Sequence, residues 1–371
     1  MRTRNLLAGF ALICLLAAPA PAQPRISEFD ATIPTFDVSG PRTITESGIY
    51  RLTRDIESSE TPAVVIESFE PIEVVLDLNG FEIRGNDLAG PLDLRAAEGR
   101  IRVMNGTLQT PRRQGVVTGG LARSLELTDV ELIGGDYGIE MVLGEALRIQ
   151  RSRIASHRCI SASAPEAWRP AFDHNLFECA WVGFDLQNNV GGRIADNRIE
   201  IGPATHAPFN IRNGDGLLFL RNTWTGERSQ WAQISCDRIH MAGNRFFGMA
   251  FAIRGDGIQF RDNEIDTDIW PAQPRSAVEI LGDDVKVRGN RVDAGPWIPG
   301  VTVRGDRTQV FENDIAAIDT PALRLYGVDS WMRSNRFVRT SLQPYPFLTP
   351  VILADPDSDL GDNLCNGEPC F

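Results

Sequence analysis

Residues 195–199 read ADNRI, and the same pattern returns as LRNTW at 220–224, AGNRF at 242–246 and RDNEI at 261–265. Together with the apolar residue that precedes it, each copy fits one template of six residues: an apolar residue, two variable residues, Asn, one variable residue and another apolar residue. The Asn slots that fit it, with gaps of 19 to 27 residues, are Asn175, Asn197, Asn222, Asn244, Asn263, Asn290, Asn313 and Asn335. A period near 23 residues predicts a repeat architecture.

The series extends upstream of these asparagines. Ser152 fills the slot one repeat earlier, and Asn79 stands in VLDLNGFEI, while Asn105 and Asp129 occupy the slot one residue early. The sequence therefore predicts about twelve repeats. Although 371 residues could form two or three ordinary domains, a continuous repeat predicts a single elongated domain.

Each repeat divides into three short strands. Residues 301–318 show the division most clearly: VTVRGD, then TQVFE, then Asn313, then DIAAI. Apolar and polar residues alternate within each piece, so each strand has one face in a core and one in solvent. Hairpins cannot repeat this regularly in about 23 residues, whereas a coil that advances one strand spacing per turn can. An all-β fold with parallel pairing between coils follows.

The repeated Asn falls at the turn between the second and third strands. Asn tolerates the left-handed conformation that a sharp turn requires, and its amide both donates and accepts hydrogen bonds. Stacked Asn side chains can bond from coil to coil as a ladder. The Asn repeat is therefore predicted to be structural and not catalytic.

This Asn pattern resembles that of the right-handed parallel β-helix proteins of the pectate-lyase-like superfamily, whose inner Asn ladder lies at the same turn. The stretch VVLDLNGFEIRG at 74–85 is similar to the first-coil signature of many exported β-helix repeat proteins. The resemblance covers residues 63–357 and implies a single-stranded right-handed parallel β-helix of about twelve coils of ~23 residues. It is specific for fold and not for activity.

The N-terminus has the features of a signal peptide. Arg2 and Arg4 precede an apolar run over 6–16 and a small-residue APA site at 20–22. We expect residues 1–22 to be a signal peptide, 23–62 an N-terminal cap, 63–358 the β-helix and 359–371 a C-terminal tail. The protein is then exported, to the periplasm or outside the cell. The apolar run is too short for a membrane span, so no membrane insertion is expected.

Charge and cysteines restrict the partners. The formal net charge of −12 disfavours nucleic acid and anionic membranes. Cys159 and Cys179 are about one repeat apart and so are candidates for spatial neighbours; Cys365 and Cys370 are placed to close a small loop, and Cys236 is expected to be a buried thiol. No CxxC pair or Cys/His cluster suggests zinc.

The resemblance implies a substrate groove on the outer face of the first strand of each coil, beside the loops that precede it. Alternation centres these strands on GIEMV, CISAS, WVGFDL, PFNIR, WAQIS, AFAIR, AVEIL, GVTVR and ALRLY, within residues 138–326. It puts Val182 in one inward row with Ile160 and Phe209, and it puts Asp185 in one outward row with Arg212.

Polar outward residues of these strands are the candidate site. Arg212 and Arg254 are candidate catalytic bases, because arginine could neutralise or deprotonate a uronate sugar. Gln233 and Arg304 are candidate substrate ligands. Asp185 and Glu279 are candidate Ca²⁺ ligands through carboxylate oxygens, and no other cofactor is expected. The alternative is that outward strand positions are charged for solubility.

Aromatic residues in the preceding loops add to this hypothesis. Trp231, Trp270 and Trp297 are candidate sugar-stacking residues, and Trp168 and Tyr345 lie in similar loops. Each of these aromatics can instead fold over the coil and bury itself.

A series of aspartates, including Asp256, Asp283 and Asp284, follows the first strands. Asp is a natural turn residue. Paired aspartates also resemble those of β-helix polygalacturonases, but the His-Gly and Arg-x-Lys elements of that family are missing, which disfavours this kind of hydrolase. Two functions remain: an exported β-helix that associates with polysaccharide, and a lyase that acts on an acidic glycan.

Overall fold

The structure is a computed structural model. It describes residues 33–58, 61–86, 89–96, 98–111, 115–163, 168–203, 208–267, 276–340, 350–353 and 362–370. These residues form strands and turns and no helix, and hence no helix long and apolar enough to cross a membrane. The compact unit Pro34–Phe371 holds all the strands.

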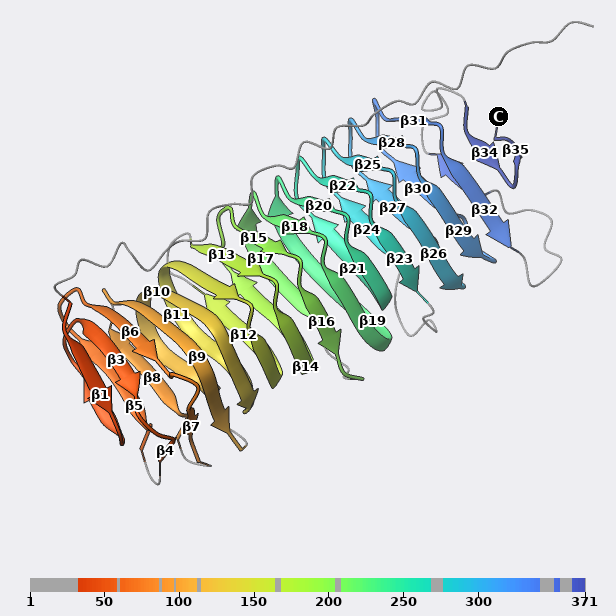
Figure 1. Cartoon of the computed structure of the whole chain (residues 1–371). Coiled ribbons are helices and arrows are strands. Elements are labelled where there is room, and N and C mark those ends of the chain that lie inside the picture. The colour runs from red at the N-terminus through yellow and green to blue at the C-terminus, as the bar shows by residue number, and fades with distance from the viewer. Residues whose placement is uncertain are drawn as a thin grey trace, which may run out of the picture. The chain divides into compact units, whose positions relative to one another are not determined.

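The strands form three columns that the chain visits in turn, once per coil, and successive coils lie side by side (Figure 1). The first column includes β2(Arg42–Ile44), β5(Val64–Ser68), β8(Leu92–Ala96), β17(Phe209–Asp215), β24(Val278–Leu281), β27(Val301–Arg304), β30(Leu323–Tyr326) and β33(Val351–Leu353). The second column includes β1(Thr35–Val38), β3(Gly48–Leu52), β6(Glu73–Asp77), β13(Arg169–Asp173), β15(Arg193–Ala195), β18(Leu218–Leu220), β20(His240–Ala242), β22(Gln259–Arg261), β25(Lys286–Arg288), β28(Gln309–Phe311) and β31(Trp331–Arg333).

The third column, which follows the Asn turn, includes β4(Ile56–Glu57), β7(Glu82–Arg84), β16(Arg198–Ile201), β23(Glu264–Thr267), β26(Arg291–Pro296), β29(Asp314–Ile318), β32(Arg336–Thr340) and β34(Leu364–Cys365). Longer strands bend through a corner and serve two or three columns: β9(Arg100–Thr110), β10(Gly115–Gly134), β11(Tyr137–Gln150), β12(Arg153–Ser163), β14(Leu176–Gln187), β19(Thr223–Asp237) and β21(Arg245–Arg254). All pairings between coils are parallel in the described residues, and only β35(Glu368–Pro369) pairs antiparallel, with β34. The expected parallel β-helix of about 12 turns is confirmed.

The core lies inside the coil and is apolar. Phe and Trp side chains from successive coils touch one another: Trp224 is 5.4 Å from Phe184 and 4.7 Å from Phe209 between ring centroids, and Phe251 is 4.8 Å from Phe246. All five are fully buried. Burial of large apolar side chains is the main favourable term for this fold.

The Asn ladder is present and buried. Asn244 donates from Nδ2 to Phe219 O at 2.9 Å and to Asn263 Oδ1 at 3.0 Å, and its own Oδ1 accepts from the backbone N–H and Nδ2 of Asn222. The same pattern of hydrogen bonds recurs at the ladder asparagines from Asn197 to Asn335. At Asn175, Oδ1 accepts from the backbone N–H of Ser152 alone. Each ladder Asn thus satisfies a buried backbone N–H and a buried backbone carbonyl at the turn.

One detail of the predicted turn is wrong. From Asn175 to Asn335 the left-handed residue is not the ladder Asn but the residue before it, for example Arg221 with φ 53° and Asp262 with φ 53°. Upstream, Asn79, Asn105 and Asp129 are themselves left-handed. The ladder Asn itself must keep its side chain directed inward to reach the neighbouring coils. Any side chain that tolerates positive φ can occupy the preceding position, which is why Asp, Arg, Glu, Ser and Gly all appear there.

Both ends of the repeat contribute strands that pair with the columns. The segment expected as a cap, 23–62, contributes β1 to β4, which pair with the columns, while 23–32 lie outside the described residues. The segment expected as a tail, 359–371, contributes β34, which pairs with β32. Asn363 there accepts at Oδ1 from Asn335 Nδ2 at 2.9 Å and extends the ladder by one step.

Glycines line the turn from the first column to the second. Gly255, Gly282, Gly305 and Gly327 have φ between 142° and 155°. A Cβ on Gly255 would lie 2.3 Å from Cys236 O, and one on Gly282 would lie 1.7 Å from Gly255 O. The coils approach so closely here that only glycine fits.

The cysteines behave as expected. Cys159 and Cys179 form a disulfide between adjacent coils, with 5.5 Å between their Cα atoms, and Cys365 bonds to Cys370. Cys236 is a buried free thiol, and burial raises its pKa to about 11.

We predict that Asn244→Ala lowers the free energy of unfolding by about 3 kcal/mol, because two buried N–H groups and one carbonyl lose their partners. Urea titration followed by circular dichroism measures the change. Gln259→Ala on an exposed strand face is the control and is expected to change it by less than about 0.5 kcal/mol. Equal effects of the two substitutions would show that the ladder contributes no particular stability.

Gly255→Ala is expected to destabilise the fold by about 3 kcal/mol or to prevent folding, because its Cβ collides with a backbone carbonyl. Gly40→Ala is the matched control, since a Cβ there meets nothing within 4 Å. A thermal midpoint of Gly255→Ala equal to that of the control would contradict the close approach of the coils.

The raised pKa of Cys236 predicts a pH-dependent stability. The unfolded thiol ionises near the ordinary value of 9.0 while the folded thiol stays neutral until about 11, so stability falls as pH rises through this window. The slope of the free energy of unfolding against pH should flatten in Cys236→Ala.

In Cys14→Ser protein at pH 8, a thiol reagent should react with Cys236 only after urea is added. Rapid reaction of the folded protein would place the thiol at the surface.

Candidate functional site

The first column lies where the sequence predicted it. The pairing from Ile139 to Leu323 follows the predicted rows in every coil except that of Phe184. Its outer face carries two rows of side chains. The middle row runs Thr118, Glu140, Ser161, Asp185, Asn210, Gln233, Ala252, Glu279, Thr302 and Arg324.

The predicted register of one coil is wrong by two residues. Ile160 pairs with Phe184, not Val182, and Phe184 pairs with Phe209. Trp181 and Val182 lie at the corner between the third and first columns, because the strand runs on to Gln187. Asp185 therefore belongs to the middle row and is not beside Arg212.

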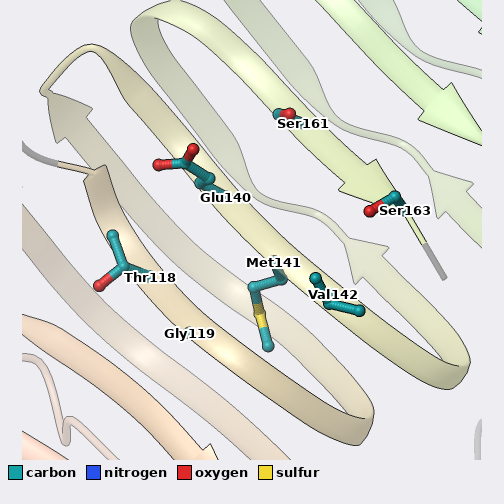
Figure 2. A pocket seen from close by; sticks show the side chains of 7 residues that line it. All are labelled: Thr118, Gly119, Glu140, Met141, Val142, Ser161 and Ser163. Carbon is teal, nitrogen blue, oxygen red and sulfur yellow. The ribbon is translucent and has the colours of Figure 1, made fainter. Parts of the chain in front are cut away.

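A pocket opens on this face near its N-terminal end (Figure 2). It has a volume of about 300 Å³ and is lined by Thr118, Gly119, Glu140, Met141, Val142, Ser161 and Ser163. The carboxylate of Glu140 lies between the strand positions of Thr118 and Ser161, so hydroxyl and carboxylate groups of three coils converge here. The pocket can accept hydrogen bonds from hydroxyl groups of a ligand.

The second row, at the C-terminal ends of the strands, carries arginines at alternate coils. Arg254 lies between Ser235 and Leu281, and Leu281 pairs with Arg304. Arg212 lies two coils before Arg254. With a strand spacing of about 4.8 Å, neighbouring arginines in this row are about 10 Å apart. All three are exposed.

These arginines differ from most others in the described part of the chain. Arg212 donates to Asn210 Oδ1 at 3.1 Å, Arg304 lies 5.2 Å from the centre of the Tyr326 ring, and neither forms an ion pair there. Arg254 and Arg324 likewise form no ion pair with a described residue. Arginines of the other columns usually do, as in Arg245 with Glu264, Arg288 with Glu312 and Arg336 with Asp314.

Glu279 and Arg324 show that part of the middle row is covered. Glu279 faces outward yet is 4% exposed, and Thr302 beside it bonds to Ser276 through the two hydroxyls at 2.6 Å. Nε of Arg324 is buried and has no hydrogen-bond partner in the described residues.

The two predicted Ca²⁺ ligands are not brought together. Asp185 and Glu279 are four strands apart in the middle row, about 19 Å at the spacing of parallel strands. One ion cannot contact both, because Ca²⁺–oxygen distances are about 2.3–2.6 Å. Among the described residues, no three His, Cys, Asp or Glu side chains are grouped to hold a metal ion.

The aromatic residues predicted to stack on sugars differ in how deeply they are buried. Trp168 is fully buried and donates from Nε1 to Gln187 O at 2.7 Å, so it belongs to the core. Trp231 is half-buried on β19, in the row beside Ala250, and Trp297 is 45% exposed at a corner. Trp270 and Tyr345 lie outside the described residues.

The aspartate series is structural. Asp237, Asp256, Asp283 and Asp306 each accept at Oδ1 a backbone N–H from the next coil, at 2.8 to 2.9 Å. These bonds hold the turn after the first column. The turn interpretation of this series is therefore the one that the geometry supports.

No family model matches this chain, and no curated protein matches its sequence. Among solved structures, the A-module of mannuronan C-5 epimerase AlgE6 from Azotobacter vinelandii is similar over 84% of this chain and 91% of that one, with 13% sequence identity and a TM-score of 0.44. The identity is too low to carry that protein's activity to this chain.

Proposed function

We propose that this protein is exported and binds an extended acidic polysaccharide along the outer face of the first column. The observation that carries the proposal is the row of Arg212, Arg254 and Arg304. On a chain of net charge −12, these guanidinium groups are exposed and make no ion pair with a described residue.

The spacing of the row favours a polymer over a small anion. Charges about 10 Å apart along the stacking direction match a chain that presents acid groups at regular intervals. Guanidinium groups bind carboxylates and sulfates through paired N–H donors. Gln233 lies in the neighbouring row and can bond to sugar hydroxyls, and the exposed Trp297 supplies an apolar surface for a sugar ring.

A lyase activity has weaker support. Guanidinium groups are poor general bases, and nothing else in the described residues beside Arg212 or Arg254 supplies one. These residues are better suited to neutralise an acid group of the ligand. Binding is therefore the function that the geometry supports best.

The triple variant Arg212→Ala, Arg254→Ala, Arg304→Ala is expected to bind alginate or polygalacturonate at least about tenfold more weakly, because each exposed ionic contact contributes up to about 1 kcal/mol. Affinity chromatography and calorimetry at low ionic strength measure this. The difference should shrink in high salt, which screens exposed charges.

The matched control is Arg245→Ala, Arg288→Ala, Arg336→Ala, which removes the same charge from the other two columns. It should bind as the wild type does. Equal losses in the two triple variants would mean that only net charge matters, and no binding of the wild type to any acidic polymer would end the proposal. Ultraviolet absorbance of an unsaturated product in the same samples tests the lyase alternative.

A further inference from the structure

Three successive coils bring unlike side chains to one corner between the third and first columns. The imidazole of His157 lies 3.6 Å from Asp136 Oδ1, measured from Nδ1, and its ring meets the Trp181 ring edge-on with 5.8 Å between centroids. Trp181 is 45% exposed. An exposed indole beside a carboxylate and an imidazole offers one apolar face and several hydrogen-bonding groups.

The adjacent position holds an arginine and a tyrosine. Arg158 donates from Nη1 to the Tyr137 hydroxyl at 2.7 Å, and its guanidinium carbon lies 5.1 Å from the centre of the Tyr137 ring. Arg158 forms no ion pair with a described residue. Because the tyrosine hydroxyl accepts this bond, its hydrogen is available to donate to another group.

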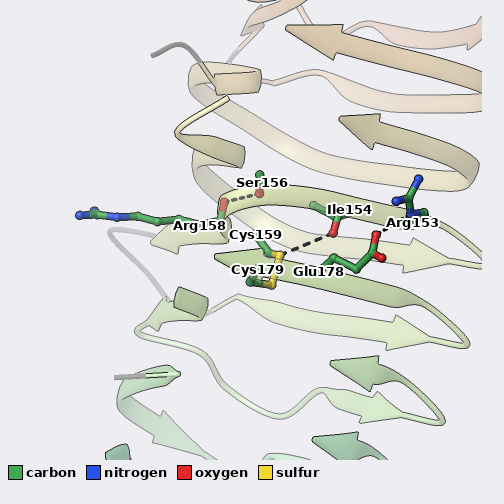
Figure 3. Close-up of a disulfide and its surroundings, with 7 residues drawn as sticks. All are labelled: Arg153, Ile154, Ser156, Arg158, Cys159, Glu178 and Cys179. Atoms are coloured by element: carbon green, nitrogen blue, oxygen red, sulfur yellow. Dashed lines mark hydrogen bonds and ion pairs between the residues drawn. A yellow bond between two sulfur atoms is a disulfide. The ribbon is translucent and has the colours of Figure 1, made fainter. Parts of the chain in front are cut away.

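A disulfide joins the coils at this corner (Figure 3). Cys159 follows Arg158 directly, and its partner Cys179 precedes Trp181 by two residues. Ser156 also donates to Arg158 O at 2.8 Å. The disulfide links the coil of Arg158 to the coil of Trp181. It therefore restrains the backbone that carries these two side chains, as a preorganised binding site requires.

We infer that this corner is a subsite for one acidic sugar residue, with Trp181 as its stacking surface and Arg158 as the ligand of its acid group. The hydroxyl of Tyr137 and the His157–Asp136 pair bond to ring hydroxyls. The inference rests on the proposed function, because it concerns the same ligand. It adds a contact at the N-terminal edge of the column, distinct from the arginine row at the opposite edge.

The corner adjoins the pocket on the same strands. Glu140 follows Tyr137 by three residues on β11, and Ser161 follows Arg158 by three residues on β12. Both residues line the pocket. Three residues of strand span about 10 Å, so a sugar at the corner has its neighbour within reach of the pocket.

Short acidic oligosaccharides of two to three sugars test the subsite, since they are too short to bridge the arginine row. Trp181→Ala and Arg158→Ala are each expected to bind alginate oligosaccharides at least about fivefold more weakly. Tyr137→Phe keeps the ring and should have a smaller effect. Trp331→Ala, a surface tryptophan of the second column, is the control and should bind normally.

The outcomes separate the two proposals. If Trp181→Ala and Arg158→Ala bind the oligosaccharides as the wild type does, while the arginine-row variant loses affinity for the polymer, the subsite is wrong and the proposed function stands. If the wild type binds neither polymer nor oligosaccharide, both fail. Circular dichroism checks that each variant is folded. Should Trp181→Ala fail to fold, Arg158→Lys, which keeps the charge but not the paired donors, decides the question by the same assay.

Discussion

The parallel pairing of one coil on the next, with its buried Asn ladder, is the constraint on which the rest of the structure depends. At the turn between the second and third columns, the residues on either side of the ladder Asn bond from coil to coil through the backbone. The Asn side chains bond to further backbone groups there: Asn222 Oδ1 accepts the N–H of Asn197, and Asn197 Nδ2 donates to Phe172 O. Because the ladder runs from coil to coil, it fixes the register of every column at once. Inward positions must then be apolar, and positions at close approach must be glycine.

This constraint leaves only the outward rows and the corners free to vary. On much of that surface arginines and carboxylates pair, and such exposed pairs contribute little to stability. In the first column Arg95 follows this pattern, since it pairs with Asp93. Arg212, Arg254 and Arg304 do not, since they form no ion pair with described residues. At its N-terminal edge the pocket and the corner around Trp181 also carry polar groups. The three arginines without an ion pair therefore make this face the candidate binding surface.

Much of the fold could be predicted from the sequence because the repeat is local: the Asn slots and the alternation of each strand identify the three columns. The register at Phe184 could not be predicted, because two extra corner residues look the same as strand residues. Asn363 also fits the Asn template, but the predicted series leaves it out because its distance from Asn335 in the sequence is longer than the other gaps. The corner of Asp136, His157 and Trp181 was missed because its members lie in different coils with no repeated motif. Arg212, Arg254 and Arg304 could be placed in one row from the sequence. Only the structure showed that Arg245 and Arg288 form ion pairs, whereas the three arginines of the row form none with described residues.

The central claim is that an acidic glycan lies on the arginine row of the first column. Modification by phenylglyoxal with and without saturating alginate or polygalacturonate, quantified by mass spectrometry of peptides, tests it most directly. The account predicts that the bound polymer protects Arg212, Arg254 and Arg304, while Arg245, Arg288 and Arg336 react at unchanged rates. Protection of the second and third columns, or bound polymer with no protection of the first, would contradict it.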